Sequence, residues 1–253
     1  MKVTFLGVGE ACDPACGNTS ILVESEFGAK KHYILLDCGF TTPHRYFSFN
    51  LEADALDALW ISHFHGDHFF GVPLLLLRFW EMGRIKPLQV IGREGIREKI
   101  DLALELAYPG FGEKLRFPLE YLIVEQGESL KAAGLTWGFA ENIHSQPCLA
   151  VRIDDNEKAV FYSGDGCPTE QSGKLAQGCD LIIHEAYRLA GHTPNHGNVR
   201  DVAAFARKAG AKHLAVVHVA HFERLHQAAI AREFEKTADL HAFLPEAGDS
   251  ISL

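Results

Sequence analysis

The segment His63-Phe64-His65-Gly66-Asp67-His68 constrains this chain more than any other, because four of its six residues can bind a metal ion. An apolar run, Leu56–Ile61, precedes it, and the pattern predicts a helix over Phe69–Phe79 after it. In a loop between these elements, the first two histidines share one face of the extended backbone, while the aspartate and the last histidine can turn toward a second point. Imidazole and carboxylate ligands suit a divalent transition metal. The spacing therefore indicates a loop that serves two ions rather than an ordinary His-rich loop.

Other residues that can bind a metal stand at the ends of later apolar runs. They are His144 after the predicted strand Leu135–Glu141, Asp165 after Ala159–Ser163, and His218 after His213–Val217. A buried imidazole or carboxylate without a partner would be costly. Gly164 and Gly166 leave space beside Asp165, so its carboxylate can bridge two closely spaced ions. Each residue alone would be read as a hydrogen-bonded core histidine or a capping aspartate, but together with the first loop they predict ligands.

Short apolar runs predict strands along the whole chain, with helical patterns between them. The predicted strands are Val3–Leu6, Ser20–Glu24, Tyr33–Asp37, Ala58–Ser62, Leu88–Ile91, Tyr121–Val124, Leu135–Glu141, Leu149–Ile153, Ala159–Ser163, Leu181–His184 and His213–Val217. The predicted helices are Phe69–Phe79, Glu94–Ala107, Leu175–Gln177, Val199–Ala209 and Glu223–Lys236. Two pairs four residues apart, Leu102 with Leu106 and Ile230 with Phe234, predict buried helix faces. This mixture predicts stacked sheets covered by helices, in a single domain over residues 1–253.

Charge and composition limit the classes of partner. The 253 residues, 47% of them hydrophobic, suffice for one large domain or two small ones. A net charge of −9 argues against nonspecific attraction to nucleic acid or to an anionic membrane. It does not exclude a phosphate substrate, because bound divalent ions would reverse the local field.

The sequence predicts a cytoplasmic protein with no membrane partner. Polar residues and Gly7 break the first apolar run too early for a secretory signal, and no apolar stretch is long enough to span a membrane. We expect the six scattered cysteines to be reduced thiols. Cys12 and Cys16 have the spacing of a metal knuckle, but no second close pair accompanies them, which favours a glycine-flanked loop.

The order H-x-H-x-D-H, then His144, then Ser-Gly-Asp165, then His218 resembles the metallo-β-lactamase-fold hydrolases over essentially the whole chain. The resemblance implies an α/β (α+β) fold, a four-layer αββα sandwich with a dinuclear site at one edge between the two sheets. It assigns His63, His65 and His144 to metal one, Asp67, His68 and His218 to metal two, and Asp165 to the bridge. We expect two divalent ions, zinc first, with manganese or iron as alternatives, because the site lacks thiolate.

Leu35-Leu36-Asp37-Cys38-Gly39 is similar to the early D-x-G motif of this fold. The resemblance implies that Asp37 holds the ligand loop by hydrogen bonds. An ordinary turn after a strand is the open alternative.

Two further segments resemble the ribonuclease Z-like phosphodiesterase branch. Asp180–Ala186 is similar to its H-E-A motif, and His196 stands where that group carries an extra catalytic histidine. The resemblance implies that hydroxide activated by the ions attacks phosphorus and that His196 protonates the departing alkoxide as a general acid. Glu185 would orient His196, and Asp67 would accept a proton from the attacking water. A loop histidine and a surface glutamate are the plain alternatives for His196 and Glu185.

One departure from this branch concerns the substrate. The transfer-RNA enzymes of the branch insert a long basic arm between the histidine and aspartate that correspond to His144 and Asp165, whereas here a single hairpin joins them. Its tip, Asp154-Asp155-Asn156-Glu157, is expected to repel a phosphate backbone. We therefore expect a small or cyclic phosphodiester as substrate and do not expect tRNA.

Three alternative functions stay open. They are an RNA 3′-processing endonuclease whose clamp comes from another subunit, a hydrolase of lactones, thioesters or other acyl substrates, and a noncatalytic nucleotide-sensing module.

Aromatic residues after Asp37 form a second group of interest, namely Phe40, Tyr46, Phe47 and Phe49. They can stack on a base, pack onto the domain, or form the contact of a homodimer. Phe79 and Trp80 end an apolar helical stripe and are expected in the core or an interface. We treat His32, His44, His192, His213, His221, His226 and His241 as ordinary polar residues.

Overall fold

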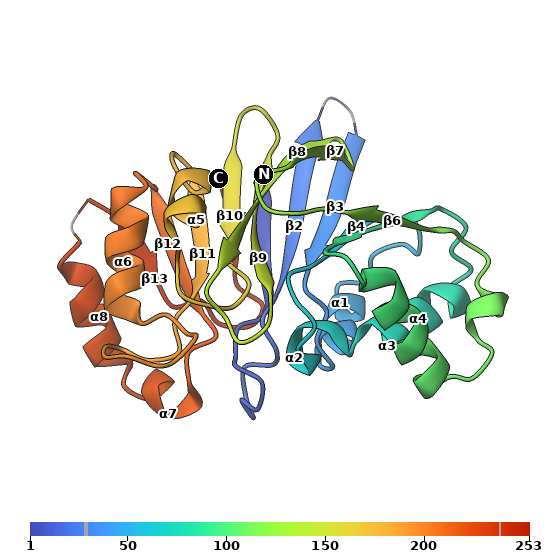
Figure 1. The fold of residues 1–253 in the computed structure, drawn as a ribbon, viewed down its shortest axis with the longest axis horizontal. Helices are drawn as coiled ribbons and strands as arrows, with labels where there is room; N and C mark the ends of the chain where they lie inside the picture. Colours follow the sequence, from blue (N-terminus) through green and yellow to red (C-terminus); the bar gives the residue numbers. More distant parts are fainter. Residues whose placement is uncertain (28–29, 238) are drawn as a thin grey trace.

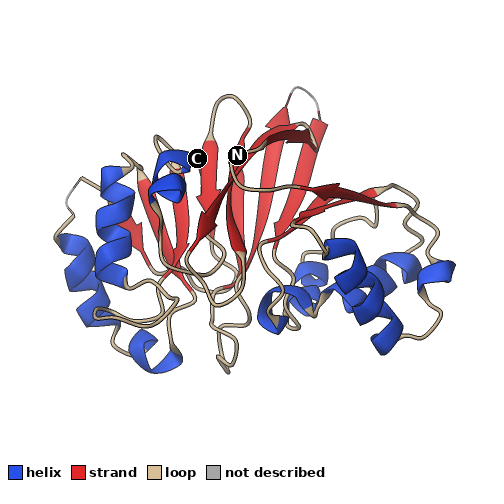
Figure 2. Ribbon diagram, in the orientation of Figure 1, coloured by secondary structure: helices blue, strands red, loops and turns tan. Residues whose placement is uncertain are grey.

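The computed structural model describes residues 1–27, 30–237 and 239–253. Within these residues two seven-stranded sheets face one another, and helices cover the outer side of each sheet (Figures 1 and 2). This arrangement confirms the predicted αββα sandwich. No helix among the described residues is long and apolar enough to cross a membrane.

The first sheet has the strand order β14-β1-β2-β3-β4-β5-β6. Its strands are β1 (Lys2–Gly7), β2 (Ser20–Phe27), β3 (Lys30–Leu36), β4 (Leu56–Ile61), β5 (Leu88–Gly92), β6 (Leu119–Ile123) and β14 (Ser250–Ser252). Strands β3 to β6 are parallel to one another. Parallel strands end at the same edge, so Asp37 after β3 and the His63–His68 loop after β4 emerge together.

The second sheet has the order β13-β12-β11-β10-β9-β8-β7. Its strands are β7 (Ser129–Ala132), β8 (Leu135–Asn142), β9 (Cys148–Asp154), β10 (Ala159–Tyr162), β11 (Leu181–Glu185), β12 (His213–Val217) and β13 (His241–Phe243). Strands β10 to β13 are parallel, and β8 runs in the same direction as β10 because both are antiparallel to β9. The carboxyl ends of β8, β10, β11 and β12 therefore share one edge, which carries the other predicted site residues.

Helices cover both outer faces. The chain forms α1 (Thr42–Ser48), α2 (Gly66–Phe69), α3 (Val72–Glu81), α4 (Ile96–Ala107), the short 3-10 turn η1 (Gly112–Lys114), α5 (Glu170–Leu175), α6 (Val199–Lys208), α7 (His221–Arg224) and α8 (Gln227–Glu235). Helices α1 to α4 lie on the side of the first sheet, and α5, α6 and α8 lie on the side of the second (Figure 1).

Three apolar clusters correspond to the three interfaces between the four layers. The cluster between the sheets draws side chains from both, and Trp60 stacks on Phe139 there with ring centroids 5.2 Å apart. A second cluster joins the first sheet to α1, α3 and α4, and a third joins the second sheet to α6 and α8. Burial of these faces supplies the main driving force for the fold.

The predicted strands all correspond to observed strands, but several predicted helices differ. The helix predicted over Phe69–Phe79 is divided between α2 and α3, because the N–H of Gly71 donates to the Cys38 carbonyl at 2.8 Å and Pro73 begins a new helix. The helix predicted over Glu223–Lys236 is likewise divided between α7 and α8. The one predicted around Leu175–Gln177 is wrong, since α5 ends at Leu175. The prediction omitted α1, β7, β13 and β14.

The predicted buried face of α4 is also wrong. Leu102 and Leu106 are 57% and 76% exposed, whereas Ile96, Ile100 and Leu104 are buried against the first sheet. Both sets have a spacing of four residues, and the two sets differ by two positions, which places them on opposite sides of the helix.

The β9–β10 hairpin is present as predicted, but its acidic tip lies away from the metal-binding edge. The tip precedes β10, whereas Asp165 follows that strand, so the two stand at opposite ends of the sheet. Asp155 is buried there and accepts a hydrogen bond of 2.8 Å from the Ser25 hydroxyl of the first sheet. The prediction that this tip repels a phosphate chain at the site is therefore wrong.

Candidate metal centre

The ligand loop begins where the buried strand β4 ends, and it needs a close backbone approach. A Cβ atom at Gly39 would lie 1.9 Å from the Asp67 carbonyl oxygen, so only glycine lets the segment after β3 pass beside the loop. The N–H of Cys38 also donates to the His68 carbonyl at 2.7 Å. These contacts fix the loop against the end of β3.

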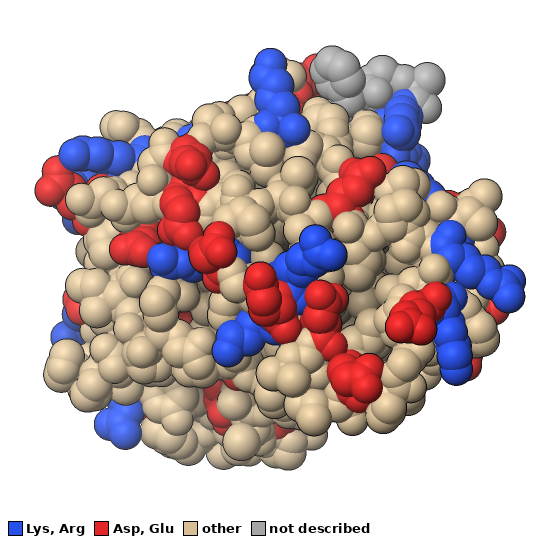
Figure 3. Space-filling view, turned by 45° about the vertical axis from the view of Figure 1, so that its right-hand side comes forward, with Lys and Arg blue, Asp and Glu red and all other residues tan. Residues whose placement is uncertain are grey.

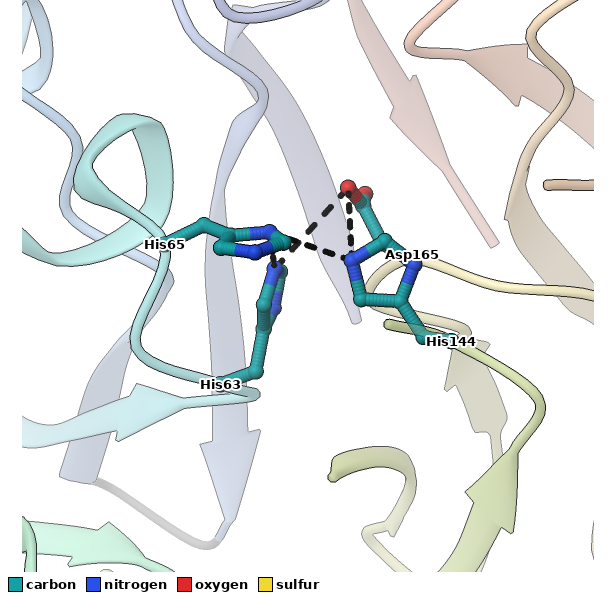
Figure 4. Close-up of side chains that lie close together, drawn as sticks. All are labelled: His63, His65, His144 and Asp165. Carbon is teal, nitrogen blue, oxygen red and sulfur yellow. Dashed lines mark hydrogen bonds and ion pairs between the residues drawn. The ribbon is translucent and has the colours of Figure 1, made fainter. Parts of the chain in front are cut away.

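The first candidate ligand group is His63, His65, His144 and Asp165, which Figure 4 shows converging on one point. Nδ1 of His65 lies 3.0 Å from Nε2 of His63 and 3.1 Å from Nε2 of His144. Asp165 Oδ2 lies 3.9 Å from the Nε2 atoms of both His63 and His144. This is the set predicted for metal one, together with the predicted bridge.

The second candidate group is Asp67, His68, Asp165 and His218. Asp67 Oδ2 lies 3.3 Å from Nε2 of both His68 and His218. Asp165 presents Oδ1 to His68 at 3.3 Å and Oδ2 to His218 at 3.4 Å. Asp165 is thus the residue common to both groups, in the position predicted for a bridge.

The spacing of these atoms fits metal ions. Ligand atoms about 2.0–2.2 Å from a zinc ion would lie roughly 3.0–3.6 Å from one another, which matches most of the distances in both groups. Nε2 of His68 and Oδ1 of Asp165 are buried without a hydrogen bond. A cation between them would satisfy both atoms.

The electrostatics also favour a cation. Burial lowers the pKa of the His63 and His65 imidazoles, and neighbouring histidines lower it further. Both imidazoles are therefore neutral, which is the form that binds a metal ion. Burial would lower the pKa of His218, but the Asp165 and Asp67 carboxylates together outweigh burial and raise it to about 9. Burial would raise the pKa of Asp165, yet His218 and His68 hold it well below its usual value. The second group thus favours added positive charge, which a divalent ion would supply.

Asp37 occupies the supporting position predicted for it. It is fully buried, and its φ of 59° is unusual for a residue other than glycine. Its Oδ1 accepts from the Ser62 N–H at 2.8 Å, and its Oδ2 accepts from His68 Nδ1 at 2.7 Å. This confirms that Asp37 holds the ligand loop by hydrogen bonds.

Glu185 and His196 lie together beside the two groups. Oε1 of Glu185 lies 3.4 Å from Nδ1 of His196, and the His196 ring lies 5.1 Å from that of His144 and 5.9 Å from that of His218. Burial would lower the pKa of His196, but the Glu185 carboxylate raises it above the usual value. Glu185 is fully buried, so the plain alternative of a surface glutamate is wrong.

The structure therefore brings together every residue predicted for the site, and their roles as ligands and acid stay predictions. Sequence reasoning missed Ser62 and Tyr162, which both bind Asp37, and the Asn195 carbonyl, which accepts from His144 Nδ1 at 3.0 Å. Ser62 stands beside His63 and offered a weak signal. Tyr162 stands in an apolar run and resembles a core residue.

The aromatic group after Asp37 is divided. Tyr46 is fully buried in the core, and Phe47 is partly buried against it; both rings pack edge-on against Phe79. Phe40 and Phe49 are 52% and 42% exposed. The homodimer stays a prediction. Cys12 and Cys16 are free thiols, and neither belongs to a candidate metal group among the described residues.

The fold and the site define the class of protein, a metal-dependent hydrolase of the metallo-β-lactamase fold. Solved structures agree. YhfI from Bacillus subtilis superposes with a TM-score of 0.82 at 23% identity, covering 99% of this chain and 98% of that one. Human tRNase Z, short form, gives 0.76 at 23% identity, covering 100% and 99%. A diphosphatase of the PhnP family gives 0.72 at 19% identity, covering 100% and 97%.

Residues 1–241 match the family of the anti-Pycsar protein Apyc1, and the chain belongs to that family. It is also 31% identical to ribonuclease BN of Escherichia coli over 273 aligned positions, covering 87% of this chain and 89% of the relative. These relatives confirm the ribonuclease Z-like branch predicted from the H-E-A motif.

Proposed function

We propose that this protein is a dinuclear metal-dependent phosphodiesterase that cleaves a small or cyclic phosphodiester, with His196 as general acid. The observation that supports it best is the position of His196. Its Nδ1 faces Glu185 at 3.4 Å, and its ring packs beside His144 of the first ligand group and His218 of the second. A hydrolase of acyl substrates needs the two ligand groups but has less need of the pair formed by Glu185 and His196.

The ligand groups would hold two divalent ions, with Asp165 between them. When bound, the ions supply an activated water nucleophile and neutralise charge on the phosphoryl oxygens. We propose zinc first, with manganese or iron as alternatives, because histidine and carboxylate donors without thiolate suit all three.

The protein's own residues complete the chemistry. Nδ1 of His196 faces Glu185, so Nε2 is free to donate a proton to the departing alkoxide. The Glu185 carboxylate favours the protonated imidazole that this step requires. The pKa of Asp67 is held well below its usual value because His218 and His68 outweigh its burial, so the carboxylate is ionised and can accept a hydrogen bond from the attacking water.

We propose a small substrate because the segment between His144 and Asp165 is short. Only β9, β10 and the loops around them lie between these residues, which leaves no long arm to hold a tRNA. The net charge of −9 points the same way. On the face in Figure 3, acidic and basic side chains alternate, and the described residues there form no continuous basic field.

The 31% identity to ribonuclease BN favours a second candidate, an RNA-processing nuclease. One panel separates the candidates, namely bis(p-nitrophenyl) phosphate, cyclic nucleotides, a precursor tRNA, and lactones with thioesters, each tested with zinc- and manganese-loaded protein. The proposal expects turnover of cyclic nucleotides at rates well above those for RNA or acyl substrates. Turnover of acyl substrates alone would contradict it, as would tight nucleotide binding without hydrolysis. Processing of precursor tRNA with no activity on cyclic substrates would favour the second candidate.

A further inference from the structure

Tyr162 lies between the two sheets and contacts Asp37, which supports the candidate metal centre. It belongs to β10 of the second sheet, is fully buried, and packs in the apolar cluster between the sheets. Its hydroxyl donates to Oδ2 of Asp37 at 2.6 Å. Asp37 follows β3 of the first sheet, so this hydrogen bond joins the two sheets at the edge that carries the ligands.

The same Asp37 oxygen contacts a ligand of the second group. Oδ2 accepts from Nδ1 of His68 at 2.7 Å. Because a carboxylate oxygen can only accept, a neutral His68 carries its proton on Nδ1, which leaves the Nε2 lone pair for an ion beside Asp67 and Asp165. Asp37 therefore sets the tautomer in which His68 can bind an ion.

Ser62 extends this control to the first group. Its hydroxyl donates to Asp37 Oδ2 at 2.8 Å, which uses its single proton. The Ser62 oxygen lies 3.0 Å from Nδ1 of His63 and can then only accept from it. His63 consequently carries its proton on Nδ1 and presents Nε2 to His65, inside the first ligand group.

We propose that Tyr162 is a positioning residue for both metal ions. Its hydroxyl, donated from the opposite sheet, fixes the Asp37 carboxylate in the one orientation that orders His68 directly and His63 through Ser62. The proposal rests on the two-ion site of the proposed function. Tyr162 reaches no substrate, and its effect is expected in metal affinity before it appears in turnover.

A phenylalanine at this position would keep the packing and remove one charge-assisted hydrogen bond. Asp37 Oδ2 would keep its donors from Ser62 and His68 but lose the Tyr162 hydroxyl, the donor that comes from the second sheet. Loss of a hydrogen bond that supports a metal ligand typically weakens metal affinity about 10- to 100-fold. We expect Tyr162→Phe to weaken zinc binding within that range.

Tyr46 offers a matched control. It is also fully buried, and its hydroxyl has no hydrogen-bond partner among the described residues. It packs against Phe47 and Phe79, in the layer between the first sheet and its helices. Tyr46→Phe therefore removes the same atom from a buried site without touching Asp37.

The experiment measures zinc affinity of the full chain by competition with a chromophoric chelator, with circular dichroism and thermal melting to compare the fold. Tyr162→Phe should bind both zinc ions about 10- to 100-fold more weakly than the unaltered protein, and Tyr46→Phe should match the unaltered protein. Unchanged affinity in Tyr162→Phe, or an equal loss in Tyr46→Phe, would overturn the proposal.

A double variant tests whether Tyr162 acts through Asp37. Once Asp37→Asn has weakened zinc binding, adding Tyr162→Phe should cause little further loss, because both changes break the same network. Losses that multiply would mean that Tyr162 acts by another route, which would also overturn the proposal.

Failure here can be told apart from failure of the proposed function. If the unaltered protein binds two zinc ions and cleaves phosphodiesters while Tyr162→Phe binds zinc equally well, only the positioning role fails. If it binds two zinc ions, Tyr162→Phe weakens them, and no phosphodiester is cleaved, only the proposed function fails.

Discussion

Oε1 of Glu185 accepts hydrogen bonds from the backbone N–H of Gly197, next to His196, at 2.8 Å and of Gly166, next to Asp165, at 3.0 Å. The same oxygen lies 3.4 Å from Nδ1 of His196. One buried carboxylate oxygen thus joins the segment of Asp165, the predicted bridge, to that of His196, the proposed acid. The geometry of the proposed acid is therefore tied to that of the candidate metal centre.

His196→Ala should lower phosphodiester turnover on the order of 10²–10⁴-fold, because the departing alkoxide then lacks its proton donor. The measurement is steady-state kinetics with elemental analysis of the same sample. Metal content should stay at the level of the unaltered protein. A matching loss of metal would show that His196 is a ligand and not the acid.

Glu185→Gln should lower turnover less than His196→Ala. The amide oxygen of glutamine can still accept from Gly166 and Gly197, so the loops stay in place while the charge beside His196 is lost. Glu185→Ala removes the acceptor as well, leaves two buried N–H groups unpaired, and should lower the melting temperature. The three variants are compared in kcat and in thermal unfolding. A Glu185→Gln variant as impaired as His196→Ala would contradict a purely orienting role.

Asp165→Ala should lose at least one ion per chain, because both ligand groups share this carboxylate. Elemental analysis after desalting checks the ratio of metal to protein. Asp154→Ala, at the opposite end of the second sheet, serves as control and should keep its full metal content. Two ions retained by Asp165→Ala would refute the bridge.

The fold and the ligand positions were predictable because their signals are local. Each predicted ligand interrupts or follows an apolar run, and strands that run in the same direction bring such ends to one edge. Tyr162 and Ser62 were not predictable in the same way. A tyrosine inside a buried strand looks like packing, and only the facing of the two sheets shows that its hydroxyl meets Asp37.

Two errors have identifiable physical causes. The exposed pair Leu102 and Leu106 has the same four-residue spacing as the buried Ile100 and Leu104, so periodicity alone could not choose the face. The charge of the acidic hairpin tip is evident in the sequence, but its place at the far end of the sheet follows only from the strand order. The tip lies at the start of β10, whereas Asp165 lies just after the end of the same strand, so the two are at opposite ends of the sheet.

Because Leu104 is buried and Leu106 is exposed, substitutions at these two positions of α4 should differ in their effect on stability. Leu104→Ala should reduce the free energy of unfolding by about 2–5 kcal/mol, because it leaves a cavity against the first sheet. Leu106→Ala, on the exposed side, should change it by less than about 0.5 kcal/mol. Chemical denaturation of both variants checks the difference. Equal effects of the two substitutions would contradict the difference in burial between Leu104 and Leu106.

Asp180 should contribute stability that disappears in acid. Burial would raise its pKa, but hydrogen bonds from Lys212 at 2.7 Å and from the Ala159 N–H at 3.0 Å lower it below the usual value. A carboxyl whose pKa is lowered on folding stabilises the protein above its unfolded pKa of about 3.9, and this contribution is lost as the pH falls through the folded value.

Asp180→Asn should therefore cost about 1 kcal/mol near neutral pH, a modest value because the lysine partner is solvent-exposed. The difference from the unaltered protein should stay constant down to about pH 5 and shrink below about pH 4. Denaturant unfolding at a series of pH values measures it. A difference that stays the same in acid would show that the charge on Asp180 contributes nothing.

In the proposed site, seven side chains hold two ions that share Asp165. The most direct measurement is an anomalous diffraction map from crystals of the zinc-loaded protein, recorded on both sides of the zinc absorption edge. We expect two peaks, one among His63, His65 and His144 and one among Asp67, His68 and His218, with the Asp165 carboxylate between them. A single peak, or two peaks that Asp165 does not contact, would contradict it.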